Sequence, residues 1–388
     1  MKNEITRLGL DDYEACLDFL KMSFNEYDHW VDFDKELPKA FRPKQELMEQ
    51  NLVLRNGSEI LALVGIYPMD LVVDGRIIRC ATVGNVATRP DARGNGYMRL
   101  LMTEALHEVD QRGFHMTRLG GLRQRYNRYG FEYGGLGCKY EWNLKNSQEY
   151  INTRGCQKFI FVPLDEDHGD LLNAAFVLYK STACNVDRID SETFLCVLRA
   201  HSMEPWAAIS EDGLFAGYVT ASADHKTINE QYALDDSRMA DLTISWLKQH
   251  NLTQVELYLK CWDRTNITIS QYAESYTIMH TSMFRIHDWE AVIEPFLQWK
   301  NKCIPLADGE MVLSIGADDR YLFSVCGETA SCKRTSLPAD LEVDRLTATR
   351  MLFGILPPEL VVSGSPELLS KLSAWLPLPL SWSRQDNV

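Results

Sequence analysis

The residues best suited to binding a charged ligand form one continuous run, VGNVATRPDARGNGYMR at positions 83–99. The run predicts a strand that ends at Thr88, a glycine-rich turn, and a helix that opens near Gly96. At such a junction, backbone N–H groups and the positive end of the helix point at one place, which suits an anion. Gly94 and Gly96 let the backbone approach a ligand closely, and the Arg93 side chain can pair with a phosphate. For so short a motif, a helix entry without a ligand is the alternative.

The local charge favours a polyanionic ligand. Between Arg89 and Gly130 there are eight arginines and four acidic residues, whereas the whole chain has a formal net charge of -14. The GxGxxG spacing of a dinucleotide site and the GK[ST] of a P-loop are both absent, which disfavours NAD and ATP. Coenzyme A is then the favoured ligand.

The composition also limits the classes of partner. An acidic chain lacks the broad basic surface that nucleic-acid binding needs and suits cationic substrates, although acidity can equally serve solubility alone. The ten cysteines show no CxxC or Cys/His spacing, so we expect buried free thiols and no metal site. No run of 18 apolar residues occurs, and the N-terminal residues do not resemble a signal peptide. These features predict no membrane partner and a reducing cytoplasm.

The segments around the run predict the elements that must hold it in place. Met98, Leu101, Ala105 and Val109 lie on one face of a helix predicted over 96–112. We further expect extended segments at 4–8, 52–54, 60–67, 77–88 and 114–119, helices at 11–24 and 123–129, and closing strands within 131–142. This order is typical of a mixed α/β sheet.

A similar order recurs downstream, which suggests an internal duplication. The expected elements are a hairpin at 206–221, a strand at 228–234, a helix at 239–250 and a strand at 255–259. The glycine turn is missing from this copy, and Asp235 and Asp236 stand where an anion would bind. A small α+β unit follows, with helices at 289–299 and 366–374 and a hairpin at 311–325. The expected domains are 1–150, 151–285 and 286–388, the second of them unable to bind the cofactor.

Two motifs resemble the GCN5-related N-acetyltransferase (GNAT) superfamily: the Arg93-Gly-Asn-Gly96 loop after Val-Ala-Thr, and Tyr126-Asn-Arg-Tyr-Gly130-Phe131. In the superfamily pattern Arg/Gln-x-x-Gly-x-Gly/Ala, Arg93 and Gly96 match, but Met98 stands at the last position. This departure, the duplicated domain and the small last domain together resemble the three-domain enhanced-intracellular-survival (Eis) acetyltransferases over nearly the whole chain.

The resemblance implies a GNAT-type mixed sheet, a second degenerate GNAT-like domain, and a third domain similar to sterol carrier proteins. The residues that resemble the sterol-carrier domain are Leu352-Phe-Gly and Leu376-Pro-Leu-Pro-Leu380. The co-substrate would be acetyl-CoA, without a metal, and a homo-oligomer is expected by the same resemblance.

The resemblance also implies roles for individual residues around the coenzyme. The backbone of Val86, Ala87 and Thr88 would pair with the pantetheine arm, and Gly121 with Leu122 would flank the acetyl group. The pyrophosphate would be held by Arg93, Gly94, Asn95, Gly96, Tyr97, Met98 and Arg99.

Two residues would move protons. Tyr126 would protonate the departing thiolate, because a phenol with an ordinary pKa of about 10 still holds its proton at neutral pH. Tyr129 is a competitor for this role, and packing under a turn is the structural alternative for Tyr126. In the Eis group the carboxylate of the last residue acts as general base, so Val388 would take that part. A polar tail without a catalytic role is its alternative.

The function implied is an acetyl-CoA-dependent N-acetyltransferase that acts on a primary amine of a small cationic molecule or peptide. Acidic and aromatic residues in Glu26-Tyr-Asp-His-Trp30 could bind such an amine. The sequence leaves aminoglycosides, polyamines, peptide N-termini and lysine side chains open as acceptors. An acyl-CoA or lipid-binding sensor or carrier without turnover is the alternative function, and a scaffold that binds no coenzyme is another.

Overall fold

The structure is a computed structural model, and it describes residues 3–24, 32–317 and 319–388. The first part of the chain forms β1 (Glu4–Arg7), η1 (Leu10–Asp12), α1 (Tyr13–Phe24), α2 (Phe33–Glu36), α3 (Gln45–Met48), β2 (Asn51–Asn56), β3 (Glu59–Pro68), β4 (Leu71–Val73), β5 (Arg76–Ile78), β6 (Cys80–Thr88), η2 (Pro90–Ala92), α4 (Tyr97–Gln111), β7 (Met116–Leu119), α5 (Arg123–Tyr126), η3 (Asn127–Tyr129) and β8 (Glu132–Asn143). The predicted elements are confirmed here with two differences. The extended segment at 77–88 is interrupted at Arg79, and the closing strands within 131–142 are one strand, β8, because β15 pairs along most of its length.

Helix α4 shows why the apolar pattern predicted this part well. Leu101, Ala105 and Val109 are fully buried, while Thr103 and His107 are exposed. A helix with one apolar face packs that face on a sheet and leaves the other in water. The buried face contributes to one hydrophobic core with strands β2, β3, β6 and β7.

The second part repeats the order of strands and helices. It forms α6 (Leu144–Arg154), β9 (Phe159–Pro163), η4 (Glu166–His168), α7 (Gly169–Lys180), β10 (Cys184–Val186), α8 (Ser191–Leu198), η5 (Ala200–Ser202), β11 (Met203–Ser210), β12 (Phe215–Ser222), β13 (Thr227–Ala233), η6 (Asp236–Arg238), α9 (Met239–Gln249), β14 (Gln254–Lys260), α10 (Asn266–Tyr272) and β15 (Ser275–Ile286). The predicted hairpin, third strand, helix and fourth strand are β11, β12, β13, α9 and β14. We call residues 1–150 the first unit and residues 151–285 the second unit.

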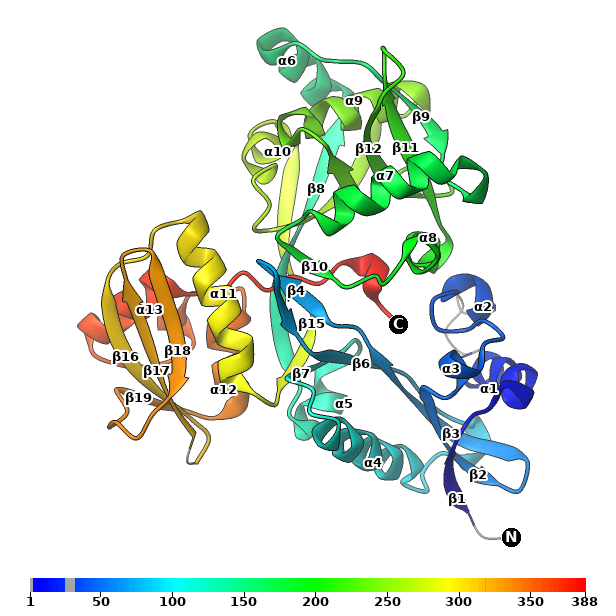
Figure 1. Cartoon of the computed structure of the whole chain (residues 1–388), viewed down its shortest axis with the longest axis vertical. Coiled ribbons are helices and arrows are strands. Elements are labelled where there is room, and N and C mark those ends of the chain that lie inside the picture. Colours follow the sequence, from blue (N-terminus) through cyan, green and yellow to red (C-terminus); the bar gives the residue numbers. More distant parts are fainter. Residues whose placement is uncertain (1–2, 25–31, 318) are drawn as a thin grey trace.

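One mixed sheet of twelve strands runs through both units, in the order β1-β2-β3-β6-β7-β15-β8-β14-β13-β12-β11-β9. Strand β6 is parallel to β7, and β13 is parallel to β14. At the centre the last strands of the two units are exchanged: β15 pairs with β7 of the first unit, and β8 pairs with β14 of the second. Figure 1 shows β8 and β15 side by side between the two units. The boundaries between the expected domains stay a prediction.

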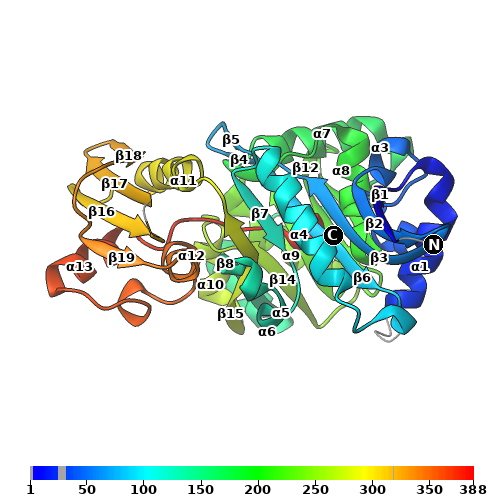
Figure 2. The same ribbon diagram turned by 90° about the horizontal axis from the view of Figure 1, so that it is seen from below.

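The third part of the chain is a small α+β group. It forms α11 (Trp289–Cys303), β16 (Gly309–Ile315), β17 (Asp319–Cys326), β18 (Thr329–Arg334), β19 (Leu341–Val343), α12 (Arg345–Phe353), η7 (Pro358–Leu360), α13 (Pro366–Trp375) and η8 (Arg384–Asp386). Its strands make a separate sheet in the order β18-β17-β16-β19, and β10, β4 and β5 make a third. Figure 2 shows this group at one end of the molecule and the N-terminus at the other.

The last residues of the chain return from the third group to the centre of the molecule (Figure 1). Leu378, Leu380 and Trp382 are buried, and the backbone N–H of Leu136 in β8 donates to the carbonyl oxygen of Leu380 at 2.8 Å. Residues 383–388, which we call the tail, then run between the two units.

All ten cysteines are free thiols, but only half of them are buried as expected. Cys303 and Cys326 are exposed, because they lie at the ends of α11 and β17 rather than on inward faces. No helix in the described ranges is both long and apolar enough to cross a membrane.

Candidate active site

The site begins where strand β6 separates from β7. The two strands pair from Cys80 opposite Met116 to Val83 opposite Leu119, and β6 continues beyond that point beside β3 alone. The separation coincides with a bulge in β6, where Asn85 has a left-handed backbone with φ of 53°. Such bulges bend a strand and are common beside active sites.

The bulge is held by a short chain of buried hydrogen bonds. The Asn85 side-chain amide donates to the Tyr67 hydroxyl at 2.9 Å, and that hydroxyl donates to the Asn51 side chain at 2.7 Å. Burial raises the pKa of Tyr67 well above its ordinary value, so it stays a donor. The edge of β6 from Val86 to Thr88 is therefore fixed in position with no β7 partner.

The glycine loop leads from this edge to an uncapped helix. Gly94 and Gly96 have φ of 85° and 77°, in the left-handed region that favours glycine. Within the described ranges no side chain caps α4, and its first turn contains no acidic residue. The side chain of Asn95 closes the loop by donating to the Ala92 carbonyl at 3.0 Å. Unsatisfied N–H groups at such a start are a site for an anion.

A cleft of about 660 Å³ covers this edge and this helix start, and its size suits a cofactor. It is lined by Ser23, Phe24, Val86, Ala87, Thr88, Ala92, Arg93, Gly94, Gly96, Tyr97, Met98, Arg99, Arg125 and Arg128. None of the described residues that line it is acidic, and four are arginines. Most of the predicted coenzyme-binding residues thus meet in one cleft, but Asn95 lies in its loop without lining it, and Gly121 and Leu122 are not among the lining residues.

The other four arginines of the basic window serve elsewhere. Arg89, Arg112 and Arg123 pair with acidic side chains, and Arg118 is buried. The count of charges thus predicted the cleft correctly but included residues that do not face it. Arg93 lines the cleft, and its guanidinium also donates to the Ser23 carbonyl at 3.3 Å, which ties the loop to the end of α1.

Tyr126, Gly121 and Leu122 follow strand β7. Tyr126 is 4% exposed, and its ring fills the space beside Gly121, where an added Cβ would lie 2.9 Å from the ring. Leu122 is 65% exposed. Tyr129 instead lines a separate cavity with Arg285, beyond the arginine cleft.

Val388, the last residue of the sequence, lies against β6 where the strands separate. A Cβ added to Gly84 would be 3.0 Å from its carbonyl oxygen and 3.2 Å from its carbonyl carbon. The last residue thus contacts a strand that lies some three hundred residues earlier in the sequence. On its other side Val388 borders a cavity of about 300 Å³, together with Tyr67 and Lys39.

Several residues of the site were not predicted. Arg125 and Arg128 flank Tyr126, and their spacing around that tyrosine could have indicated them. Ser23 and Phe24 contribute from the end of α1, and nothing local in the sequence marks them as cleft residues. The expected acceptor segment, 26–30, lies outside the described residues.

Comparisons with known proteins agree with this geometry. Residues 4–134 match the family model of the acetyltransferase (GNAT) domain. The chain contains a GNAT acetyltransferase domain. Members of this family are acyltransferases that take the acyl group from acyl-CoA. None of the curated proteins matches the chain.

Solved structures with the same fold cover the whole chain. A probable N-acyltransferase from Enterococcus faecalis V583 is 16% identical, with a TM-score of 0.71 and 100% of each chain covered. Eis1 from Mycobacterium abscessus is 16% identical, with a TM-score of 0.69, covering 99% of this chain and 100% of its own. A GCN5-related N-acetyltransferase from Anabaena variabilis ATCC 29413 is 15% identical, with a TM-score of 0.69, covering 98% and 99%. The chain therefore has an Eis-like fold over its full length.

Proposed function

We propose that the chain is an acetyl-CoA-dependent N-acetyltransferase that acetylates a primary amine of a small cationic molecule or peptide. The observation that carries the proposal is the cleft at the start of α4, where an unpaired strand edge, an uncapped helix and four arginines meet. An acyl-CoA has one part for each: an amide-containing arm, a pyrophosphate and further phosphate charge. The acceptor class is proposed from the resemblance to Eis and from the chain's net charge of -14.

The coenzyme would lie along the residues already named. The backbone of Val86 to Thr88 would pair with the pantetheine arm, and the loop from Arg93 to Arg99 would hold the pyrophosphate. The space beside Gly94 supports this fit, because a Cβ added there would meet no described atom within 4 Å. Arg125 and Arg128 would add positive charge on the opposite wall.

Tyr126 would donate a proton to the thiolate as the thioester bond breaks. Its place at the end of α5, where its ring packs against Gly121, supports this role. Tyr129 is the weaker candidate, since it borders a different cavity and its buried hydroxyl has no hydrogen-bond partner among the described residues.

Val388 would accept the proton that the amine loses as its nitrogen attacks the thioester carbonyl. The carbonyl group of Val388, which would act as a carboxylate in this role, lies beside Gly84 where β6 leaves β7, at the inner end of the strand edge that would hold the pantetheine arm. Gly121 and Leu122 would flank the acetyl group between the two proton-transfer residues.

The second unit would be a degenerate GNAT-like domain without a cofactor. Its element order and its parallel pair β13–β14 support this, as does the absence of glycine between Leu234 and Met239. The last group, 286–388, would be the sterol-carrier-like domain that the resemblance implies.

The alternative is a module that binds acyl-CoA or lipid without turnover. Turnover separates the two functions, so the test mixes the protein with acetyl-CoA and spermidine, kanamycin or a lysine-containing peptide. Coenzyme A should be measured by chromatography, because exposed Cys303 and Cys326 would react with a chromogenic disulfide.

The matched variants are Tyr126→Phe and Tyr129→Phe. We expect the first to lower kcat about 100-fold or more, as general acid catalysis is worth ~10²–10⁴, with unchanged affinity for acetyl-CoA. The second should stay within about twofold, since a phenol that takes no part in the proton transfer contributes little to that factor. Binding of acetyl-CoA without turnover of any amine would favour the carrier function, and absence of binding would exclude both functions.

A further inference from the structure

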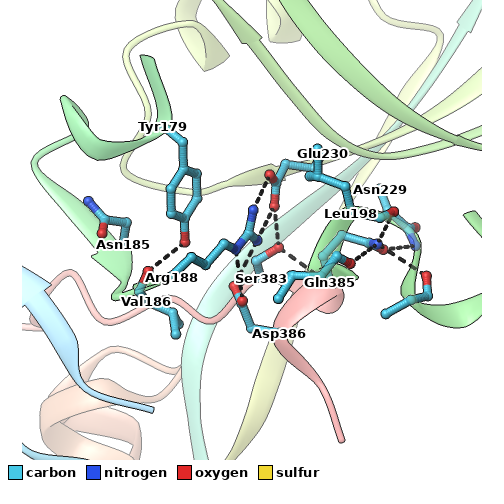
Figure 3. Close-up of polar contacts among 12 residues, drawn as sticks. Tyr179, Asn185, Val186, Arg188, Leu198, Asn229, Glu230, Ser383, Gln385 and Asp386 are labelled. Carbon is cyan, nitrogen blue, oxygen red and sulfur yellow. Dashed lines mark hydrogen bonds and ion pairs between the residues drawn. The ribbon is translucent and has the colours of Figure 1, made fainter. Parts of the chain in front are cut away.

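A buried polar cluster holds the tail against the second unit. Arg188, Glu230 and Asp386 are 1%, 3% and 0% exposed. Arg188 donates to both Glu230 oxygens at 2.9 and 2.8 Å, and to both Asp386 oxygens at 3.1 Å. Figure 3 shows the guanidinium lying between the two carboxylates. One charged residue of the second unit thus links a strand of that unit to the tail.

Each charged side chain of the cluster has an oppositely charged hydrogen-bond partner. This is the condition for burying charges without a large loss of folding free energy. Glu230 also accepts from the Tyr218 hydroxyl at 2.7 Å and from the Ser383 hydroxyl at 3.0 Å. Burial alone would raise the pKa of Glu230, but the charge and hydrogen bonds of Arg188 outweigh it and lower that pKa. Burial opposes the charge on Arg188, but Asp386 and Glu230 raise its pKa well above the ordinary value.

Gln385 fixes the tail a second time. Its side-chain nitrogen donates to the carbonyl oxygens of Val197, Leu198 and Ala200 at 3.0, 3.0 and 3.2 Å. Its side-chain oxygen accepts from Asn229 at 3.0 Å (Figure 3). An amide paired on both ends in the interior defines one register of the tail relative to the second unit.

The place where the second unit holds the tail corresponds to the arginine cleft of the first unit. Strands β13 and β14 pair at Thr227–Ile228 and then part, as β6 and β7 do. The tail enters the gap: Asn229 and Glu230 of β13 hold it on one side, and the Arg384 guanidinium lies 4.0 Å from the Tyr258 ring of β14. In the second unit, the opening between the parallel strands is therefore occupied by the protein's own chain.

Asp386, which Arg188 holds in the second unit, is only two residues from Val388, which lies against β6. A chain advances at most about 3.6 Å per residue, so fixing Asp386 restricts Val388 to within ~7 Å. Asn387 is held as well, because Arg118 of β7 donates to its side chain and the His201 ring contacts its carbonyl oxygen at 3.1 Å. The contacts that hold the tail in the second unit thus determine where Val388 lies relative to Gly84.

We propose that the second unit is a docking site for the tail, and that Arg188 is a positioning residue that holds Val388 at the strand opening of the first unit. The proposal deepens the proposed function and rests on it for its catalytic consequence. Docking itself can be measured without any acceptor.

One variant, Asp386→Asn, and one control test it. Arg188→Met leaves two buried carboxylates without their cation and can impair folding, whereas Asp386→Asn keeps the shape of the tail and the Arg188–Glu230 pair. Asp241→Asn is the control, because Asp241 is also fully buried in the second unit, accepts from Gln157 and Arg238, and among the described residues makes no hydrogen bond or ion pair with the tail.

The first readout is digestion with a carboxypeptidase, followed by intact mass at a temperature where each variant is folded. The wild type and Asp241→Asn should lose Val388 and Asn387 slowly, and Asp386→Asn at least about tenfold faster, since protease access follows local opening and weakening one charged hydrogen bond is worth ~1.5–3 kcal/mol. Equal rates in all three proteins would overturn docking.

The second readout is the pH profile of kcat with the amine that the wild type acetylates. With Val388 displaced, Asp386→Asn should fall about 100-fold at pH 7, the order expected for a misplacement near 1 Å. It should recover towards the wild type as rising pH deprotonates the amine without a base. A loss that is uniform at all pH values would be structural damage and would overturn the positioning role.

The outcomes separate the two proposals. An inactive wild type whose tail is protected and is released by Asp386→Asn would exclude the proposed function and leave docking intact. An active wild type that loses activity when extended beyond Val388, while Asp386→Asn remains fully active, would exclude the role of Arg188 alone.

Discussion

Helices α4 and α9 follow corresponding strands in the two units, yet the turns that lead into them differ. Before α4 the chain turns through Gly94 and Gly96, and no described side chain caps the helix. Before α9 the carboxylate of Asp235 accepts from the backbone of Ser237 at 2.9 Å and from its hydroxyl at 2.6 Å. The glycine turn before α4 leaves backbone N–H groups available to a ligand, whereas the turn before α9 begins with η6, which is capped by its own carboxylate, Asp235.

The gaps between the parallel strands of the two units differ in the same way: one is open to a ligand, and the other is occupied by the chain itself. In the first unit the edge beyond Val83 borders a cleft with four arginines, and in the second the corresponding gap holds Asp386 and its neighbours. The comparison indicates that one architecture can serve as a cofactor site or as a seat for a peptide segment. What decides between them is a few residues at the turn and in the gap.

The largest effect on activity is expected from filling the space beside Gly84 that Val388 occupies. Gly84→Val puts side-chain atoms where Val388 lies, 3.0 Å from an added Cβ, and displaces the last residue. We expect kcat to fall about 100-fold while the affinity for acetyl-CoA changes little. Gly169→Val is the control, since a Cβ added there meets no described atom within 4 Å. Steady-state kinetics and calorimetry measure the two quantities, and a normal kcat in Gly84→Val would contradict the role of Val388.

The next largest effect is expected when the turn before α4 receives an acidic side chain like that in the turn before α9. Gly94→Asp introduces a carboxylate into a loop that would bind pyrophosphate, whereas Gly94→Ala introduces only the strain of a side chain at φ of 85°. Losing charge-assisted hydrogen bonds worth ~2–3 kcal/mol should weaken acetyl-CoA binding about 30- to 150-fold in the aspartate variant. The alanine variant should lose far less. Equal losses in both would mean that backbone shape alone decides binding.

A smaller effect is expected at the second turn. Asp235→Ala removes the carboxylate that accepts from Ser237 at the turn before α9, so the free energy of unfolding should fall by about 1 kcal/mol. The affinity for acetyl-CoA should be unchanged, because this turn serves structure only. Thermal unfolding and calorimetry test both statements. A second binding event in the variant would contradict them.

The smallest effect concerns the contact of the tail with the first unit. Lys39 donates to the Gln385 carbonyl oxygen, and burial lowers the pKa of Lys39 to about 7. Between pH 7 and about 10 the unfolded chain binds a proton that the folded chain lacks, so stability rises with pH in this window. Relative to Lys39→Met, the wild type should gain stability from pH 7 to 10, by less than about 1 kcal/mol because the side chain is partly exposed. Urea unfolding at both pH values checks it, and a constant difference would contradict the assignment.

The arginine cleft could be predicted because its signals are local in sequence. The glycines of the loop, the preceding strand and the arginine-rich window all fall between Gly84 and Gly130. The turn before α9 was predicted for the same reason, since Asp235 and Asp236 stand where glycine would be needed. Periodicity in α4 likewise gave its buried face.

The remaining features depend on contacts between distant segments, and the sequence pattern carries no record of them. Gly84 meets Val388, and Arg188 meets Asp386, across most of the chain or half of it. The exchange of β8 and β15 between units arises in the same way. Arg93 faces the cleft as expected, but its bond to Ser23 depends on how α1 packs against the loop.

We infer that one unit binds acyl-CoA while the other, built on the same plan, does not. Titration calorimetry of the full chain with acetyl-CoA, with Gly94→Asp measured alongside, tests this difference. We expect one molecule bound per chain and loss of that binding in the variant. Two molecules per chain, or one whose affinity is unaffected by Gly94→Asp, would contradict it.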